Sequence, residues 1–175
     1  MQPNLTIDKF YVRPPVKYEE NIKELSFYRR SEAPVQAELT DWDISDCYLF
    51  DSLVGQLHVL YPKYKVEDLW LAWYRQGDYA EAHNHIGFDW SFVWYLDTCV
   101  HCSPLVFPNI LRPWLPPEVI KPKVGNLHVF DGSRPHYVPP HTCAHDRIVV
   151  SGNLIHRTVQ NDLNDGTRPQ YSKVF

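Results

Sequence analysis

The residue types most able to do chemistry in this chain are three histidines and an arginine. His83 and His85 occupy positions i and i+2, which point to the same face of a strand. His136 comes from a later segment and adds a third imidazole, a ligand that suits divalent iron, zinc, copper and nickel. Arg147 then offers a planar fork that can hold a carboxylate. This order predicts a mononuclear metal centre, and it favours non-haem iron with a carboxylate co-substrate.

The middle ligand position departs from the commonest iron site, which uses two histidines and one carboxylate. Here that position is His85. Three neutral imidazoles would leave Fe(II) with its full positive charge, which a dianionic co-substrate could neutralise. Asp89 stays open as an alternative ligand, although its separation from His83 requires a tight turn, and water is a further alternative.

The elements that must position these residues begin after residue 65. Short runs rich in β-branched and aromatic residues are separated by Gly, Pro, Asp and Asn, a pattern typical of a β-sandwich or barrel. The runs cover residues 69–74, 90–97, 127–131 and 147–154. Residues 103–122 contain six of the 15 prolines and predict an irregular loop near the mouth of the barrel, where it would shape substrate choice. We expect a polar, extended tail over residues 156–175.

Residues 1–65 predict a supporting N-terminal region. Residues 7–12 indicate a short strand, and the charged segment 17–30 indicates one helix. A second helix is expected from a leucine stripe at spacings of four, four and three, with a cap from the segment 43–46. The stripe consists of Leu49, Leu53, Leu57 and Leu60. This helix should end near Tyr61, because the residue before Pro62 avoids the helical region.

Composition bounds the class of protein. The chain has 175 residues, which favours one domain over 1–175 with its core in 66–155. The net charge is −4 and no long basic run occurs, so no nucleic-acid signature is present. Residues 1–10 lack the pattern of a signal peptide, and no apolar run approaches the roughly 18 residues that span a bilayer. We expect a cytoplasmic protein with no membrane partner.

The four cysteines do not form a disulfide framework in a chain of this length, and reduced thiols are the favoured interpretation. A structural zinc site is the alternative, because a Cys-x-x-Cys pair followed by a later cysteine and histidine has suitable ligand types. Its residues would be Cys99, His101, Cys102, Cys143 and His145.

Several segments between residues 66 and 155 together resemble the Fe(II)/2-oxoglutarate-dependent oxygenases. The likeness is to the prolyl-hydroxylase-like branch, and within it to small members encoded by bacteriophages and marine bacteria. The segments are WYRQGD at 73–78, HNH at 83–85, SFVWYL at 91–96, PKVGNLHVF at 122–130, RPHYVPP at 134–140 and RIVVSGNL at 147–154.

The resemblance implies a mainly β fold, the double-stranded β-helix or jelly roll. It also implies Fe(II), 2-oxoglutarate and O₂, with hydroxylation of a small-molecule or peptidyl substrate and release of succinate and CO₂. His83, His85 and His136 match the iron ligands, and Arg147 matches the arginine that binds the distal carboxylate of 2-oxoglutarate. Co-substrate contacts are also expected from Tyr74, Tyr95, Ser151 and Asn153.

Two other classes stay open. A cupin-like three-histidine metalloenzyme that does not use 2-oxoglutarate is favoured by the His-x-His motif. A non-catalytic β-barrel could instead bind a sugar or a peptide on an aromatic platform of Trp90, Trp94 and Trp114, although core packing is the more ordinary role of such residues.

Overall fold

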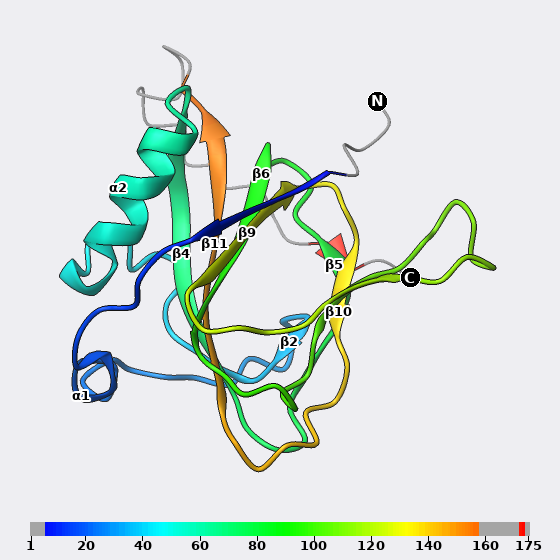
Figure 1. Ribbon diagram of the computed structural model, residues 1–175, viewed down its shortest axis with the longest axis horizontal. Coiled ribbons are helices and arrows are strands. Elements are labelled where there is room, and N and C mark those ends of the chain that lie inside the picture. Colours follow the sequence, from blue (N-terminus) through cyan, green and yellow to red (C-terminus); the bar gives the residue numbers. More distant parts are fainter. Residues whose placement is uncertain (1–5, 158–171, 174–175) are drawn as a thin grey trace.

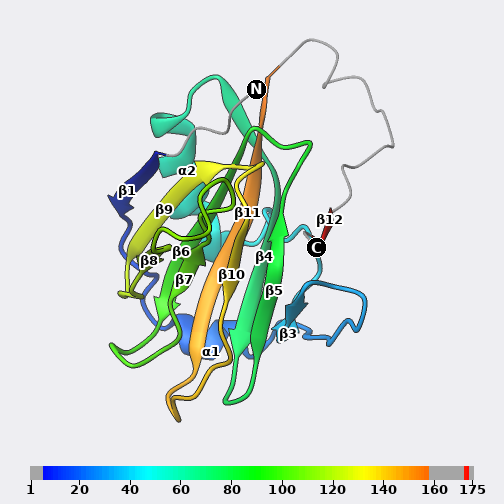
Figure 2. The ribbon, with the colours of Figure 1, turned by 90° about the vertical axis from the view of Figure 1, so that its right-hand side faces the viewer.

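The computed structural model describes residues 6–157 and 172–173, and it contains two antiparallel β-sheets that face each other (Figures 1 and 2). The larger sheet has the strand order β1 (Ile7–Tyr11), β9 (Asn126–Asp131), β6 (Trp90–Asp97), β11 (Arg147–His156), β4 (Tyr64–Tyr74) and β3 (Glu38–Leu39). The smaller sheet has the order β12 (Ser172–Lys173), β5 (Tyr79–Asn84), β10 (His136–Val138), β7 (Leu105–Phe107) and β8 (Glu118–Ile120), and β2 (Val35–Gln36) also pairs with β5. The predicted jelly roll is confirmed.

The larger sheet separates two cores because successive side chains on a strand point to opposite faces. In β4, Leu69 and Leu71 belong to the core on the helical side, whereas Trp70 and Ala72 belong to the core between the sheets. Full burial of a leucine contributes roughly 1.5–3 kcal/mol. The core between the sheets is where inward-facing polar side chains can form a site.

The leucine stripe forms the predicted helix, α2 (Asp51–Leu60), which lies against the outer face of the larger sheet (Figure 1). Leu53 and Leu57 are fully buried, and the helix ends before Pro62 as expected. The predicted cap is wrong: a short 3₁₀ helix, η1 (Tyr48–Phe50), precedes α2, and no side chain caps either one. Asp43 instead accepts hydrogen bonds from the amide and hydroxyl of Ser45, a local turn that competes with capping.

The single helix predicted over 17–30 is also wrong, because helix α1 covers only Tyr18–Ile22. Further along, the backbone of Tyr28 exchanges two hydrogen bonds with Leu39, at 2.8 and 2.9 Å. The ring of Phe27 packs edge-on against Trp73 at 5.5 Å between centroids. These tertiary contacts outweigh the weak helical preference of a charged segment.

The proline-rich stretch 103–122 is not wholly irregular. It forms a hairpin in which Leu105 pairs with Ile120 and Phe107 with Glu118, and its tip projects from the body of the molecule (Figure 1). The prediction of a loop was therefore wrong at both ends of the segment. In the predicted tail, β11 reaches His156, and residues 158–171 and 174–175 lie outside the described part of the chain.

Among the described residues, no helix combines the length and apolar character needed to cross a membrane. The single-domain organisation and the cytoplasmic location stay predictions.

Candidate metal and co-substrate site

The three predicted histidine ligands lie together between the sheets. His136 on β10 is the register partner of His83 on β5, and their ring centroids are 4.4 Å apart. His85 lies one residue beyond the end of β5, with its ring 5.2 Å from each of the other two. One ligand atom from each histidine falls within 4.8 Å of the others, and all three side chains are buried. The structure therefore brings the predicted triad together.

Hydrogen bonds orient all three rings alike. Nδ1 of His83 lies 2.7 Å from the carbonyl oxygen of Glu81, and Nδ1 of His136 lies 3.0 Å from that of Arg134. Nδ1 of His85 lies 2.6 Å from Oδ1 of Asn153. An oxygen of this kind only accepts, so each Nδ1 carries the proton and each Nε2 keeps its lone pair. Metal-binding histidines are usually held in this way.

The orientation of His85 depends on a buried polar network that the sequence did not reveal. Asn153 donates from Nδ2 to Oδ1 of Asp68 at 2.7 Å, and this contact fixes which end of the amide faces His85. Its Oδ1 also accepts a hydrogen bond from the hydroxyl of Ser91 at 2.7 Å. Asn153 was predicted to contact the co-substrate, but it instead positions a histidine. Both Asp68 and Ser91 are buried, and their roles depend on strand pairing that a single sequence does not display.

Burial keeps the triad neutral. Removal from water lowers the pKa of His83, and it lowers that of His85 to about 3 with a further contribution from His83. The pKa of His136 is well below its usual value for the same reasons, with both other histidines adding to the effect. Neutral imidazoles are the form that binds a metal.

Arg147 lies at the other end of the same space, and only 1% of its surface is exposed. It is the register partner of Tyr74 across β11 and β4, and its guanidinium carbon lies 4.6 Å from the ring centroid of Tyr74 and 5.3 Å from that of Tyr95. Within the described part of the chain, Nε and Nη1 of Arg147 and the hydroxyl of Tyr95 have no hydrogen-bond partner. Burying an unpaired cation costs several kcal/mol, so these donors fit an anionic ligand.

Burial also raises the pKa of Tyr74 and Tyr95, although the nearby Arg147 acts in the opposite direction. Both phenols are therefore protonated at neutral pH and can donate hydrogen bonds to an anion.

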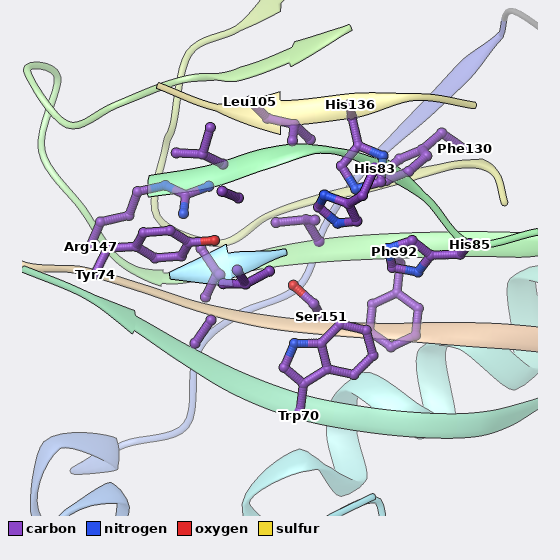
Figure 3. A pocket seen from close by; sticks show the side chains of 16 residues that line it. Trp70, Tyr74, His83, His85, Phe92, Leu105, Phe130, His136, Arg147 and Ser151 are labelled. Carbon is purple, nitrogen blue, oxygen red and sulfur yellow. The ribbon is translucent and has the colours of Figure 1, made fainter. Parts of the chain in front are cut away.

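One pocket joins the two ends (Figure 3). The triad lies at one end, Arg147 and Tyr74 lie at the other, and Ser151 lines the wall between them (Figure 3). Most of the remaining wall is apolar, with Trp70 and Phe92 among its side chains. The arrangement can hold a divalent metal at one end and a carboxylate at the other.

Two alternative predictions are not supported by the geometry. The Asp89 carboxylate accepts a hydrogen bond from the amide of His156 at 2.8 Å and does not belong to the triad. The three tryptophans form no common platform: Trp94 is fully buried, Trp90 packs against Tyr61 at 5.7 Å, and Trp114 is 76% exposed.

Comparison with known proteins finds similarity at the level of the fold. No protein-family model and no curated protein matches the chain. A prolyl-4-hydroxylase from Pseudomonas putida is 17% identical with a TM-score of 0.62, covering 87% of this chain and 93% of that one. A viral collagen prolyl hydroxylase from Paramecium Bursaria Chlorella virus-1, with 2-oxoglutarate bound, is 16% identical with a TM-score of 0.60, covering 85% and 94%.

A prolyl hydroxylase from Trichoplax adhaerens, in complex with a peptide fragment, is 14% identical with a TM-score of 0.67, covering 91% of this chain and 87% of that one. The structural neighbours thus include the prolyl hydroxylases that the sequence resembles. The predicted closeness to phage and marine bacterial members stays a prediction, although a viral enzyme is among these neighbours.

Proposed function

We propose that this protein is a non-haem Fe(II)- and 2-oxoglutarate-dependent dioxygenase that hydroxylates an as yet unidentified substrate. One observation carries the proposal: a fully buried arginine, with no carboxylate partner among the described residues, shares a pocket with three buried, neutral histidines. A ligand with one end for a metal and a carboxylate at the other fits both ends of this pocket. Fe(II) is among the divalent metals that imidazole ligands suit.

Charge supports a dianionic co-substrate. The triad contributes no charge, so a bound divalent metal keeps two positive charges, and Arg147 adds a third. The dicarboxylate 2-oxoglutarate would reduce this total to one. The missing protein carboxylate therefore makes the co-substrate more important for charge balance than it is at a site with two histidines and a carboxylate.

The residues have separate roles in this proposal. His83, His85 and His136 hold Fe(II) through Nε2, and Arg147 binds the distal carboxylate of the co-substrate with the hydroxyls of Tyr95 and Tyr74 as further donors. Ser151, which lines the pocket between the histidine triad and Arg147, faces the co-substrate. When bound, Fe(II), 2-oxoglutarate and O₂ supply the oxidising power for C–H hydroxylation, with succinate and CO₂ as co-products. The apolar wall limits the access of water to the reacting groups.

The prime substrate would approach beside the β7–β8 hairpin. A second hollow lies there, and Phe107 forms part of its wall. The ring centroid of Phe107 is 5.8 Å from that of His136, so this hollow adjoins the triad. Its other walls include Ile110, Leu111 and Pro135, which suit an apolar small molecule or a peptidyl side chain. The peptide bound by the Trichoplax adhaerens enzyme is consistent with the second choice.

The test is an anaerobic titration of metal-free protein with Fe(II) and 2-oxoglutarate, followed by the visible metal-to-ligand charge-transfer band. We expect the band in the wild type, its loss in His136→Ala, and a much higher 2-oxoglutarate requirement in Arg147→Ala. Arg75→Ala is the matched control, since Arg75 is half exposed and pairs with Glu38. A band of unchanged 2-oxoglutarate dependence in Arg147→Ala would contradict the assigned anchor.

A cupin-like three-histidine metalloenzyme is the second candidate, and the absence of a carboxylate from the triad favours it. The same titration separates the two. A protein that binds Fe(II) stoichiometrically but gives no charge-transfer band with 2-oxoglutarate belongs to this alternative class.

A further inference from the structure

Three cysteines form a second cluster outside the pocket. Cys99 and Cys102 lie in the connection between β6 and β7, and Cys143 lies in the connection between β10 and β11. Sγ of Cys99 is 3.5 Å from Sγ of Cys102 and 3.4 Å from Sγ of Cys143. All three sulfurs fall within 4.8 Å of one another, although Cys143 is 44 residues from Cys99 in sequence. The fourth cysteine, Cys47, does not belong to this cluster.

Backbone amides point at each sulfur of the cluster. The amide of Cys99 donates to Sγ of Cys102 at 3.3 Å, that of His101 to Sγ of Cys99 at 3.4 Å, and that of His145 to Sγ of Cys143 at 3.4 Å. Such donors stabilise a thiolate more than a neutral thiol, because hydrogen bonds to a charged acceptor are the stronger ones. These donors favour negative charge on the sulfurs of Cys99 and Cys143, whereas Sγ of Cys102 also donates, as a thiol, to the carbonyl oxygen of His145 at 3.6 Å.

The sulfur separations indicate what balances that charge. A zinc–thiolate bond is about 2.3 Å long, so two sulfurs on a tetrahedral zinc ion lie about 3.8 Å apart. A disulfide would require about 2.05 Å. The observed 3.4 and 3.5 Å are much closer to the first value, and small side-chain rotations make up the difference. Thiolates are also the ligands that distinguish zinc from the harder divalent metals.

We propose that Cys99, Cys102 and Cys143 bind a structural zinc ion, separate from the metal of the histidine triad. His145 does not supply the fourth ligand, because its Nε2 lies 3.0 Å from Oδ1 of Asp97 and its ring stays outside the sulfur group. His101 is exposed and its ring also lies outside the group. An exogenous ligand such as water completes the coordination.

The location gives this zinc ion a role in holding the anion-binding end of the pocket, where Arg147 lies. Cys143 precedes β11, which begins at Arg147, and Cys99 follows β6, which carries Tyr95. The same two connections also meet at the buried His141, whose Nδ1 accepts from the amide of Ser103 at 3.3 Å. A zinc ion here cross-links the ends of both strands and limits their separation.

The test uses the full chain and two metals. Wild-type protein dialysed against Zn²⁺ should bind one more zinc per chain than Cys102→Ser or Cys143→Ser, by elemental analysis. Replacement by Co²⁺ should give thiolate-to-cobalt charge-transfer bands in the near ultraviolet, which the histidine triad cannot produce. Cys47→Ser is the matched control and should keep both the zinc and the bands.

Cys143→His tests whether the loss of zinc in Cys143→Ser results only from misfolding. Histidine is also a zinc ligand, so this variant should recover most of the binding that Cys143→Ser loses. Zinc content that is equal in the wild type and both serine variants would overturn the proposal. So would the absence of thiolate bands with cobalt, or a disulfide within the cluster found by mass spectrometry of the protein as purified.

Discussion

Asn153 decides which nitrogen His85 presents to a metal. It accepts the Nδ1 proton of His85, and its own amide is held by Asp68. We expect Asn153→Ala to lower the affinity for Fe(II) by roughly tenfold to a hundredfold, because a ligand without its orienting partner loses both its tautomer and its position. Isothermal titration of metal-free protein with Fe(II) under anaerobic conditions measures this loss.

Ser91→Ala is the matched control for that network. It removes a second donor to Asn153 but leaves the contacts with both His85 and Asp68 in place. Its effect on metal affinity should be clearly smaller than that of Asn153→Ala. Equal losses in the two variants would show that the network acts through general stability and not through the histidine.

Arg147→Lys separates the charge of the anchor from its shape. Lysine keeps the positive charge but loses the planar fork that binds a carboxylate through two nitrogens. We expect the apparent Kd for 2-oxoglutarate to rise by roughly tenfold, the equivalent of about 1.4 kcal/mol. The charge-transfer band measures this change, and an unchanged Kd would mean that the co-substrate is not held by the guanidinium fork.

The residues found from sequence are those whose side chains carry distinctive chemistry. Three histidines and an arginine in a given order suffice to suggest a metal and an anion. Asp68 and Ser91 were missed because each becomes important only through its pairing with Asn153, and that pairing depends on the register of β11 with β4 and β6. The i, i+2 spacing rule predicts which residues share a face of one strand, but it does not predict which residues of neighbouring strands are paired.

At the scale of elements, the turn between β5 and β6 must bring His85 over the pocket. The amide of His85 donates to the carbonyl of Gly132 at 2.7 Å, and a Cβ at Gly132 would lie 2.4 Å from the backbone oxygen of Phe88. Gly132→Ala must therefore displace this turn. We expect it to weaken Fe(II) binding and to lower the thermal unfolding temperature, measured by titration and circular dichroism.

Gly55→Ala provides the control on the same scale. Gly55 lies within helix α2, and a Cβ there meets nothing within 4 Å. Alanine in a helix should stabilise the protein by about 0.5–1 kcal/mol without changing metal affinity. If Gly132→Ala left Fe(II) affinity unchanged and did not lower the unfolding temperature, as expected for Gly55→Ala, the close contact between residue 132 and the turn would have no effect on the site in solution.

Helices and strands were predictable where the local sequence pattern and the packing of the whole fold favour the same structure. Helix α2 has its leucines on one face and its proline at the end, so both the sheet beneath it and the sequence specify the same helix. The segment 17–30 lacks such a face, and pairing of Tyr28 with Leu39 determines its path. The hairpin of β7 and β8 was hidden because prolines dominate the sequence around two strands of only 3 residues each.

At the scale of the whole molecule, the pairing of strands in two facing sheets sets the span of the pocket. The smaller sheet aligns His83 with His136, and the larger sheet aligns Arg147 with Tyr74. Each alignment is an antiparallel register, so a shift of one residue in either sheet would turn its side chains to the opposite face. The metal end and the anion end thus belong to different sheets, and the core between the sheets holds them at a fixed separation.

Burial of the three triad histidines should make the free energy of unfolding depend on pH. The histidines of the triad have pKa values below those of the unfolded chain, about 3 in the case of His85. As pH falls below about 6.5, the unfolded chain takes up protons that the folded chain does not. The stability contributed by the neutral histidines is thus complete above that pH and is lost as pH falls toward the folded pKa values.

Urea denaturation of metal-free protein between about pH 7.5 and pH 5.5 tests this, because carboxylates stay ionised over that range. Each histidine should reduce the free energy of unfolding by at most about 1.4 kcal/mol per pH unit. His128→Asn is the control: burial lowers the pKa of His128 to about 4, and it lies outside the triad. This variant should reduce the slope by about one histidine's share and leave Fe(II) affinity unchanged. The hydrogen bond to Asp97 raises the pKa of His145, which acts in the opposite direction, so a slope in His128→Asn that is zero or reversed would show that the triad is not held neutral in the folded protein.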